Sequence, residues 1–358
     1  MIKEEHKYLM AKHFKTNSGE SNNRVEWLDI AKAYGIIAIV LGHILTGSST
    51  AHFLYWWHIP LFFLIAGIFL KPLKSTDAWS TFCKKRVISE LLMYVGIGIL
   101  LICLYTVIHH QSNQFLMKHL FDLVLGGRTL NFYTSTFWFI NVYLLTIMTV
   151  TVLISMTKNW LIILLITIAG LFFGTGYQQV TWMHINSFAM MPWGMDTVLI
   201  TAFYTYLGYL LFHGHLKWLE KIEVNMPIMA LAGLIIYIHS KGDFSFRLSL
   251  KSHLMQSSLP IGLAVAVIPV IFSLAIMVCA YFTSKIPIKF GLPIIGRHTL
   301  AIMYGHKLFL DLCLLIGMRS LPVRLAIGII APVMIALIVQ KVGKSIFERS
   351  GGQLIDKV

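Results

Sequence analysis

Lys32 and His43 are two ionisable side chains in an otherwise mostly apolar segment, LDIAKAYGIIAIVLGHI, at residues 28–44. On an α-helix, a separation of eleven residues makes three turns plus about 20° and a rise of roughly 16 Å, so both side chains share one face. If the helix enters a bilayer near Lys32, His43 lies about half-way through a hydrocarbon core of ~30 Å. Because an ionisable residue at that depth is costly, the pair indicates a functional site.

Two more histidines, His58 and His306, lie inside or at the edge of apolar runs. Each could simply pack between helices and bond a backbone carbonyl. Imidazole titrates near neutrality and suits proton transfer, so we predict His43, His58 and His306 as the catalytic histidines. If Arg297 marks the inner entry of its helix, His306 reaches a depth of roughly 13 Å, where it could meet His43 in one cavity. No carboxylate has a liganding spacing in these helices, and we expect no metal.

The composition is that of a membrane protein. Of the 358 residues, 57% are hydrophobic and 12% are charged, whereas a soluble protein has about 25% charged residues. In a soluble protein the net charge of +14 would suggest nucleic acid. Here we expect the charge to lie in short loops and to set the topology, and we expect no nucleic-acid partner.

Apolar runs recur along the chain and predict an all-α, polytopic integral membrane protein with about ten transmembrane helices. With ten helices, most Lys and Arg residues fall in cytoplasmic segments, so we expect both termini to be cytoplasmic. We divide the chain into a polar cytoplasmic tail at residues 1–28, one transmembrane domain at 29–341 and a cytoplasmic tail at 342–358. The second run is short, and we expect a broken or re-entrant helix there. The predicted helices are 30–47, 57–71, 88–108, 135–156, 160–176, 194–212, 226–240, 258–283, 294–317 and 321–341.

Basic residues gather at the predicted inner mouth, where Lys32 is joined by Lys84, Lys85 and Arg86. One interpretation is that they set the topology and contact lipid headgroups. The other is a phosphate-binding rim for a large anionic cofactor. On the second interpretation, Lys32, Lys85, Arg86 and Arg297 are the predicted cofactor contacts.

Lys307 and Asp311 lie four residues apart in the predicted ninth helix. They could form a mutually neutralising pair within the membrane. Alternatively, they could orient His306.

The chain resembles the membrane-bound acyltransferase-3 family, and in particular its fucose 4-O-acetylase-like O-acetyltransferase branch. Lys32, ten intervening residues and His43 are similar to the opening motif of that family, and His58 stands in the histidine position of its second block. Lys32 is a departure, since many relatives have arginine there, and Arg297-His298 is another, since a small polar pair is more usual. The blocks that resemble the family are WLDIAKAYGIIAIVLGHI (27–44), WHIPLFFLIAG (57–67), FCKKRVISELLMY (82–94), STFWFINVYL (135–144), FYTYLGYLL (203–211) and IIGRHTLAIMYGHKLF (294–309).

This resemblance implies transfer of an acyl group, usually acetyl, from acyl-CoA to a hydroxyl of a carbohydrate or lipid-linked glycan. It implies a multi-pass protein of the bacterial cytoplasmic membrane, surrounded by membrane lipids. On this view Lys32 and Arg86 would face the phosphates of acetyl-CoA, and His43 would act as general base or transient acyl carrier. Because the sequence stops at Val358, we expect no extra domain. We therefore expect the chain to acylate its acceptor itself or to pass the acyl group to a separate envelope partner, and a homodimer is left open.

Two other functions remain open at this point. A proton-coupled transporter would also place His, Lys and Asp inside the membrane. Transporters often show paired halves with matching broken helices, and the short second run has no clear counterpart in the second half. A non-catalytic relay that passes acyl groups to a partner would need the same inner site but no acceptor site.

Overall fold

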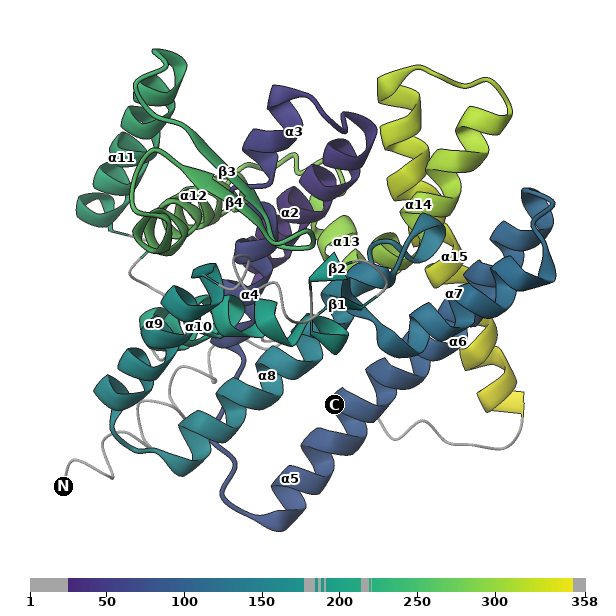
Figure 1. Ribbon diagram of the computed structural model, residues 1–358, viewed down its shortest axis with the longest axis horizontal. Helices are drawn as coiled ribbons and strands as arrows, with labels where there is room; N and C mark the ends of the chain where they lie inside the picture. Colours follow the sequence, from purple (N-terminus) through teal and green to yellow (C-terminus); the bar gives the residue numbers. More distant parts are fainter. Residues whose placement is uncertain are drawn as a thin grey trace.

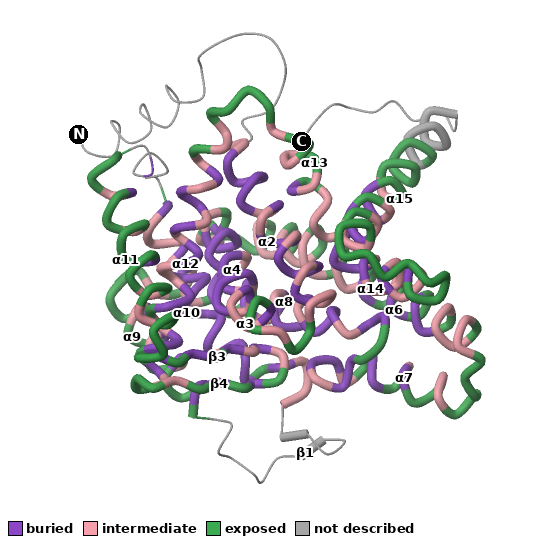
Figure 2. Tube along the Cα trace, turned by 90° about the horizontal axis from the view of Figure 1, so that it is seen from above, coloured by how far each residue is buried: buried purple, intermediate pink, exposed green. Residues whose placement is uncertain are grey.

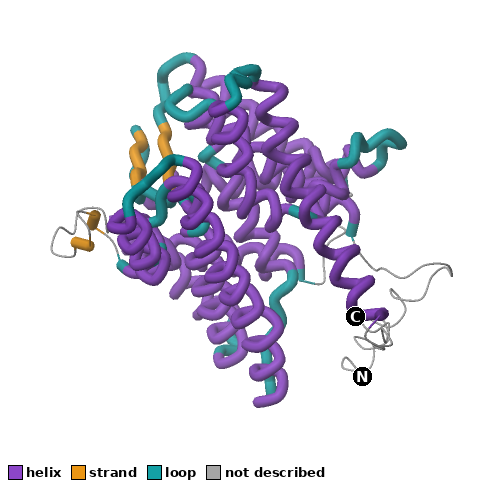
Figure 3. Tube along the Cα trace, turned by 90° about the vertical axis from the view of Figure 1, so that its right-hand side faces the viewer, coloured by secondary structure: helices purple, strands orange, loops and turns teal. Residues whose placement is uncertain are grey.

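The computed structural model describes residues 25–176, 184–185, 188–189, 191–213, 219 and 221–349, with the side chains of 343–349 left aside. Nearly every element is a helix, and two short pairs of strands lie at the edge (Figures 1 and 3). The elements are α2 Glu26–Ile44, α3 Ser49–Leu54, α4 His58–Ile68, α5 Thr76–Phe82, η1 Cys83–Ile88, α6 Ser89–Ile108, α7 Asn113–Leu125, η2 Gly127–Thr129, η3 Phe132–Thr134, α8 Trp138–Met156, α9 Trp160–Gly176, β1 His184–Ile185, β2 Phe188–Ala189, η5 Pro192–Gly194, α10 Met195–Phe212, α11 Ile222–Ser240, β3 Phe246–Ser249, β4 Leu254–Ser257, α12 Ile261–Ser284, α13 Leu292–Arg297, α14 Thr299–Leu315 and α15 Leu321–Arg349.

Within the described residues, eight helical spans are long and apolar enough to cross a membrane. The predicted all-α, polytopic membrane fold is therefore confirmed. Two further helices, α9 and α14, have 17 residues each, and both fall on predicted spans. The number of ten crossings and the cytoplasmic position of both termini stay predictions.

The buried centre of the molecule is built around α2, α4, α8 and α10, whereas α7, α9, α11 and α15 are largely exposed (Figure 2). In the α2 span, 67% of the apolar window is buried, compared with 11% in α11. The exposed side chains of α11 include Leu231, Leu234 and Ile236, which suits contact with lipid tails. The helix that carries Lys32 and His43 is thus as well buried as the 49–68 span and the span that contains α10.

Glycine allows α4 and α10 to cross at backbone contact. A Cβ atom at Gly67 would overlap the Thr205 carbonyl oxygen, and one at Gly208 would overlap the Leu64 carbonyl oxygen. Small residues at helix crossings allow this close approach in membrane proteins, where packing and not water exclusion holds helices together. This crossing fixes α4, and with it His58, against the centre of the bundle.

The turn at Tyr55–Trp57 separates α3 from α4, so the break lies at the start of the run predicted at 57–71 and not within it. The span predicted as one helix at 294–317 is instead α13 and α14, which meet at His298 with φ −110° and ψ 22°. A Cβ atom at Gly296 would overlap the Asp29 carbonyl oxygen, so glycine lets α13 pack directly on α2.

Two features of the fold were not predicted from the sequence. An antiparallel hairpin, β3–β4, lies in the connection between α11 and α12 (Figure 1). The last helix continues to Arg349, past the boundary placed at residue 341. Most of the predicted 1–28 tail lies outside the described residues, and α2 begins at Glu26.

Candidate active site

Two adjoining cavities follow the face of α2 that carries Lys32 and His43. The larger, with a volume of about 380 Å³, is lined by Lys32, and the smaller, about 130 Å³, is lined by His43. Ile39, Phe139 and Met303 line both cavities. The two cavities therefore meet at these three side chains, between Lys32 and His43.

An ion cluster borders the larger cavity, which we call the inner cavity. The Lys32 ammonium lies 2.6 Å from Asp29, and Arg297 Nε lies 3.5 Å from the other carboxylate oxygen. The Asp29 side chain is 3% exposed and that of Arg297 is 49% exposed. Arg297 is thus held beside Lys32 through Asp29, although it does not line the inner cavity itself.

Arg86 reaches the inner cavity from η1, a π-helical turn between α5 and α6. Its guanidinium donates a hydrogen bond to the Tyr143 hydroxyl and lies 5.9 Å from the centre of that ring. π-Helical turns often occur at functional sites. Glu90 lines the same cavity, and its Oε2 atom is buried without a hydrogen-bond partner in the described part of the chain. Lys85 is exposed and is not brought into the cavity.

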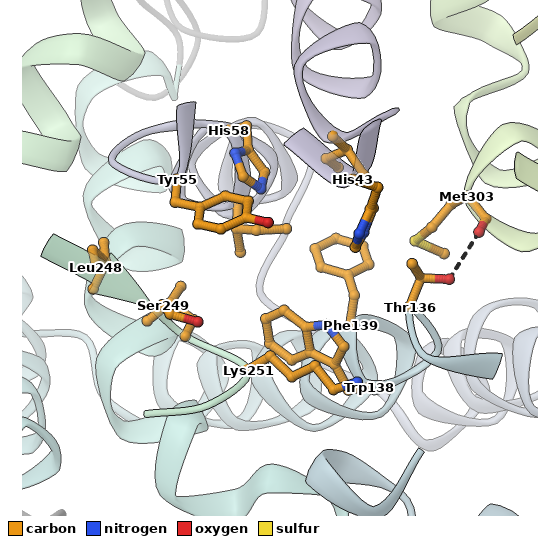
Figure 4. A pocket seen from close by; sticks show the side chains of 13 residues that line it. His43, Tyr55, His58, Thr136, Trp138, Phe139, Leu248, Ser249, Lys251 and Met303 are labelled. Atoms are coloured by element: carbon orange, nitrogen blue, oxygen red, sulfur yellow. Dashed lines mark hydrogen bonds between the residues drawn. The ribbon is translucent and has the colours of Figure 1, made fainter. Parts of the chain in front are cut away.

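His43 and His58 both line the smaller cavity, which we call the outer cavity (Figure 4). His58 Nδ1 lies 2.6 Å from the Leu54 carbonyl oxygen. Because a carbonyl can only accept, Nδ1 carries the proton, and Nε2 of a neutral His58 is left with a lone pair. The cavity thus contains two imidazoles, from α2 and α4, that could accept a proton from a substrate.

His306 lies behind His43 and does not line the outer cavity. The two ring centres are 5.3 Å apart, with an angle of 32° between the planes. His306 is fully buried, and its Nδ1 lies 2.7 Å from the Ile302 carbonyl oxygen. Its Nε2 has no hydrogen-bond partner in the described residues. This geometry suits a residue that positions His43 better than one that touches a substrate.

Lys251, which is not among the predicted site residues, also lines the outer cavity. It lies in the turn of the β3–β4 hairpin, and its Nζ donates to the carbonyl oxygens of Leu130 and Ser135 at 2.6 and 2.8 Å. Burial first, and the nearby Lys307 charge second, lower the pKa of Lys251 to about 7. A cation that titrates near neutrality therefore faces the two histidines.

A period-two pattern marks this hairpin in the sequence. Phe244, Phe246, Leu248 and Leu250 are buried, whereas the residues between them are exposed or half-buried. Alternation of this kind indicates a half-buried strand. The pattern could have located the hairpin, but it gives no sign that Lys251 turns inward.

Among the described residues, Asp311 forms its ion pair with His109 and not with Lys307 as predicted. Its carboxylate accepts from the Tyr133 hydroxyl and lies 2.7 Å from His109 Nε2. These contacts connect α14 to η3 and to His109, which directly follows α6. The His109 ring also stacks on the Tyr105 ring, with ring centres 4.2 Å apart.

Two adjoining cavities, two imidazoles and a half-buried lysine are thus gathered along α2. Among the described residues, no group of three or more His, Cys, Asp or Glu side chains could hold a metal ion. The comparisons of the chain with curated proteins and with solved structures each found no match. A family model described as an acyltransferase domain, that of the acyltransferase-3 family, matches residues 25–340. Because the match covers most of the chain, this multi-pass membrane protein belongs to the acyltransferase-3 family.

Proposed function

We propose that this membrane acyltransferase moves an acetyl group from cytoplasmic acetyl-CoA to a hydroxyl of a cell-envelope carbohydrate or lipid-linked glycan. The observation that carries the proposal is the pair of adjoining cavities along α2, with Lys32 at one end and His43 at the other. We place the protein in the bacterial cytoplasmic membrane, with the inner cavity towards the cytoplasm.

The donor binds with its phosphates at Lys32 and Arg86, which both line the inner cavity. Lysine supplies a compact charge, and the guanidinium supplies several donors in a planar fork. The pantetheine arm follows α2, where about 16 Å of helical rise separates Lys32 from His43. Ile39, Phe139 and Met303 form the apolar junction through which the thioester passes.

The reaction is completed in the outer cavity. The acceptor hydroxyl oxygen attacks the thioester carbonyl carbon, and His43 takes the hydroxyl proton. The tetrahedral intermediate then breaks its carbon–sulfur bond, and the leaving thiolate takes that proton from His43. The products are the acetyl ester and free CoA, with His43 returned to its neutral form. His58 shares the cavity and orients the acceptor, while His306 positions His43 from behind.

The test is an assay of labelled acetyl transfer by purified protein in detergent, with envelope glycans as acceptors. His43→Ala should lower kcat by about 10²–10⁴-fold, the usual contribution of general acid–base catalysis. His52→Ala, on the neighbouring α3 and outside both cavities, is the matched control and should keep wild-type transfer. Wild-type rates in His43→Ala would reject the assignment. Proton-coupled solute flux without acetyl-CoA would favour a transporter instead.

A further inference from the structure

The outer cavity contains a lysine that the donor path does not use. Lys251 comes from the β3–β4 turn, which follows β3 at Ser249 and precedes β4 at Leu254. His43 and His58 lie on one side of the cavity, and Lys251 lies with Trp138 on the other (Figure 4). An acyl group that reaches His43 would therefore lie between an imidazole and an ammonium group.

The hydrogen bonds of Lys251 leave one donor unassigned. An ammonium group has three N–H donors. Two of them meet the carbonyl oxygens of Leu130 and Ser135. Carbonyl partners stabilise the charged form, and the third N–H is left for a group in the cavity that Lys251 lines.

Other residues hold the backbone around Lys251 through hydrogen bonds and an ion pair. The Lys251 carbonyl accepts from Arg128 Nε at 3.1 Å, and Arg128 in turn pairs with Asp196. His253 Nδ1 lies 3.3 Å from the same carboxylate, and Thr197 donates to the Leu250 carbonyl at 3.4 Å. The turn is thus held by several contacts besides those of the lysine ammonium.

The Lys251 side chain is half-buried, and removing an ammonium group from water costs free energy unless it is paired. The two carbonyls of Leu130 and Ser135 could be met by neutral donors as well. Preorganised cations in sheltered sites are, however, a principal means of stabilising charge that develops during a reaction. In acyl transfer that charge develops on the carbonyl oxygen of the acyl group.

We propose that Lys251 is a further catalytic residue, whose ammonium donates a hydrogen bond to the acyl carbonyl oxygen as the acceptor hydroxyl attacks. This inference rests on the proposed function. The carbonyl π electrons move onto the oxygen when the new carbon–oxygen bond forms, and they return when the carbon–sulfur bond breaks. Lys251 stabilises that oxyanion and keeps its proton throughout, while the hydroxyl proton passes through His43 to the thiolate.

The pH dependence follows from the lysine's surroundings. The groups that face it are His43 from α2, His58 from α4, Lys307 from α14 and Arg128 from η2. Burial and the Lys307 charge hold the pKa of Lys251 at about 7. Because the protonated form is the donor, the rate should fall as pH rises through that value.

The test measures kcat, KM and pH–rate profiles of Lys251→Met and Lys251→Arg in the full-length protein. Lys251→Met should lower kcat by about 10²–10³-fold, as loss of an oxyanion donor does elsewhere, with KM for acetyl-CoA unchanged. Lys251→Arg stays charged at high pH, so it should keep activity and lose the fall above about 7. Arg247→Met removes an exposed cation from the same hairpin and is the matched control.

The outcomes separate the two proposals. Wild-type protein that transfers no acetyl group rejects the proposed function. Active wild type together with wild-type kcat in Lys251→Met rejects only the role of Lys251. A fall above pH about 7 that persists in Lys251→Arg also rejects it, as does a rate that rises through this pH. If Lys251→Met does not fold, the profile of Lys251→Arg decides.

Discussion

The rings of His43 and His306 lie with their centres 5.3 Å apart, although only His43 lines the outer cavity. His306 comes from α14 and is fully buried. The two residues are far apart in the sequence, so the packing of α14 against α2 brings them together. One histidine thus lines the outer cavity, and the other packs against it from outside the cavity.

Replacing His306 should affect the chemical step and leave donor binding unchanged. In His306→Ala, the His43 ring loses the side chain behind it, and small displacements of a catalytic group cost up to about 10²-fold in rate. We expect a lower kcat with an unchanged KM for acetyl-CoA. Steady-state kinetics beside His43→Ala checks this, and a fall as large as that of His43→Ala would place His306 in the reaction itself.

Removing either cation from the inner cavity should weaken donor binding. A hydrogen bond to a charged group contributes about 1.5–3 kcal/mol, and each 1.4 kcal/mol is tenfold in affinity. Lys32→Ala and Arg86→Ala should therefore raise the Kd of acetyl-CoA by about tenfold or more. Calorimetric titration in detergent measures this, with Lys74→Ala, an exposed lysine outside the cavity, as control. Unchanged affinity in both variants would exclude a phosphate site here.

The crossing of α4 and α10 should tolerate no added methyl group. Gly67→Ala forces the two backbones apart, and overpacking of this kind typically costs about 1–3 kcal/mol of stability, so the melting temperature should fall. Gly233→Ala is the matched control, because a Cβ atom at Gly233 in α11 meets nothing within 4 Å. Thermal unfolding in detergent compares the two. Equal stability of both variants would contradict the close contact at Gly67.

The Asp196 carboxylate should control the order of the β3–β4 turn. Asp196 is buried and pairs with Arg128 and His253. In Asp196→Asn these partners lose their counter-charge, and breaking a buried pair typically costs about 3–5 kcal/mol. Hydrogen exchange should therefore speed up at residues 249–253 and kcat should fall, while acetyl-CoA affinity is kept. Unchanged exchange in the turn would show that other contacts fasten it.

The apolar pattern predicted the helices well because lipid imposes a strong constraint on length and composition. The run at 160–176 is α9 itself, and the run at 88–108 differs from α6 by one residue. The break at His298 was missed because it depends on the contact between Gly296 and α2. Such contacts between distant segments leave no local period in the sequence.

Part of the candidate site could also be predicted from the sequence. Spacing alone placed Lys32 and His43 on one face of α2, and the cavities follow that face. The estimated depth of His306 predicted that it lies near His43. It could not show that His306 lies outside the outer cavity. Lys251 could not be foreseen, since a lysine in a polar loop has no sequence feature that shows burial.

The central claim is that one acetyl-CoA molecule spans both cavities, from Lys32 to His43. A structure of the full chain with a non-reactive thioether analogue of acetyl-CoA tests it most directly. We expect the phosphates beside Lys32 and Arg86 in the inner cavity, and the acetyl carbonyl between His43 and Lys251 in the outer cavity. An analogue bound away from α2, or bound with its acetyl end at Lys32, would contradict the account.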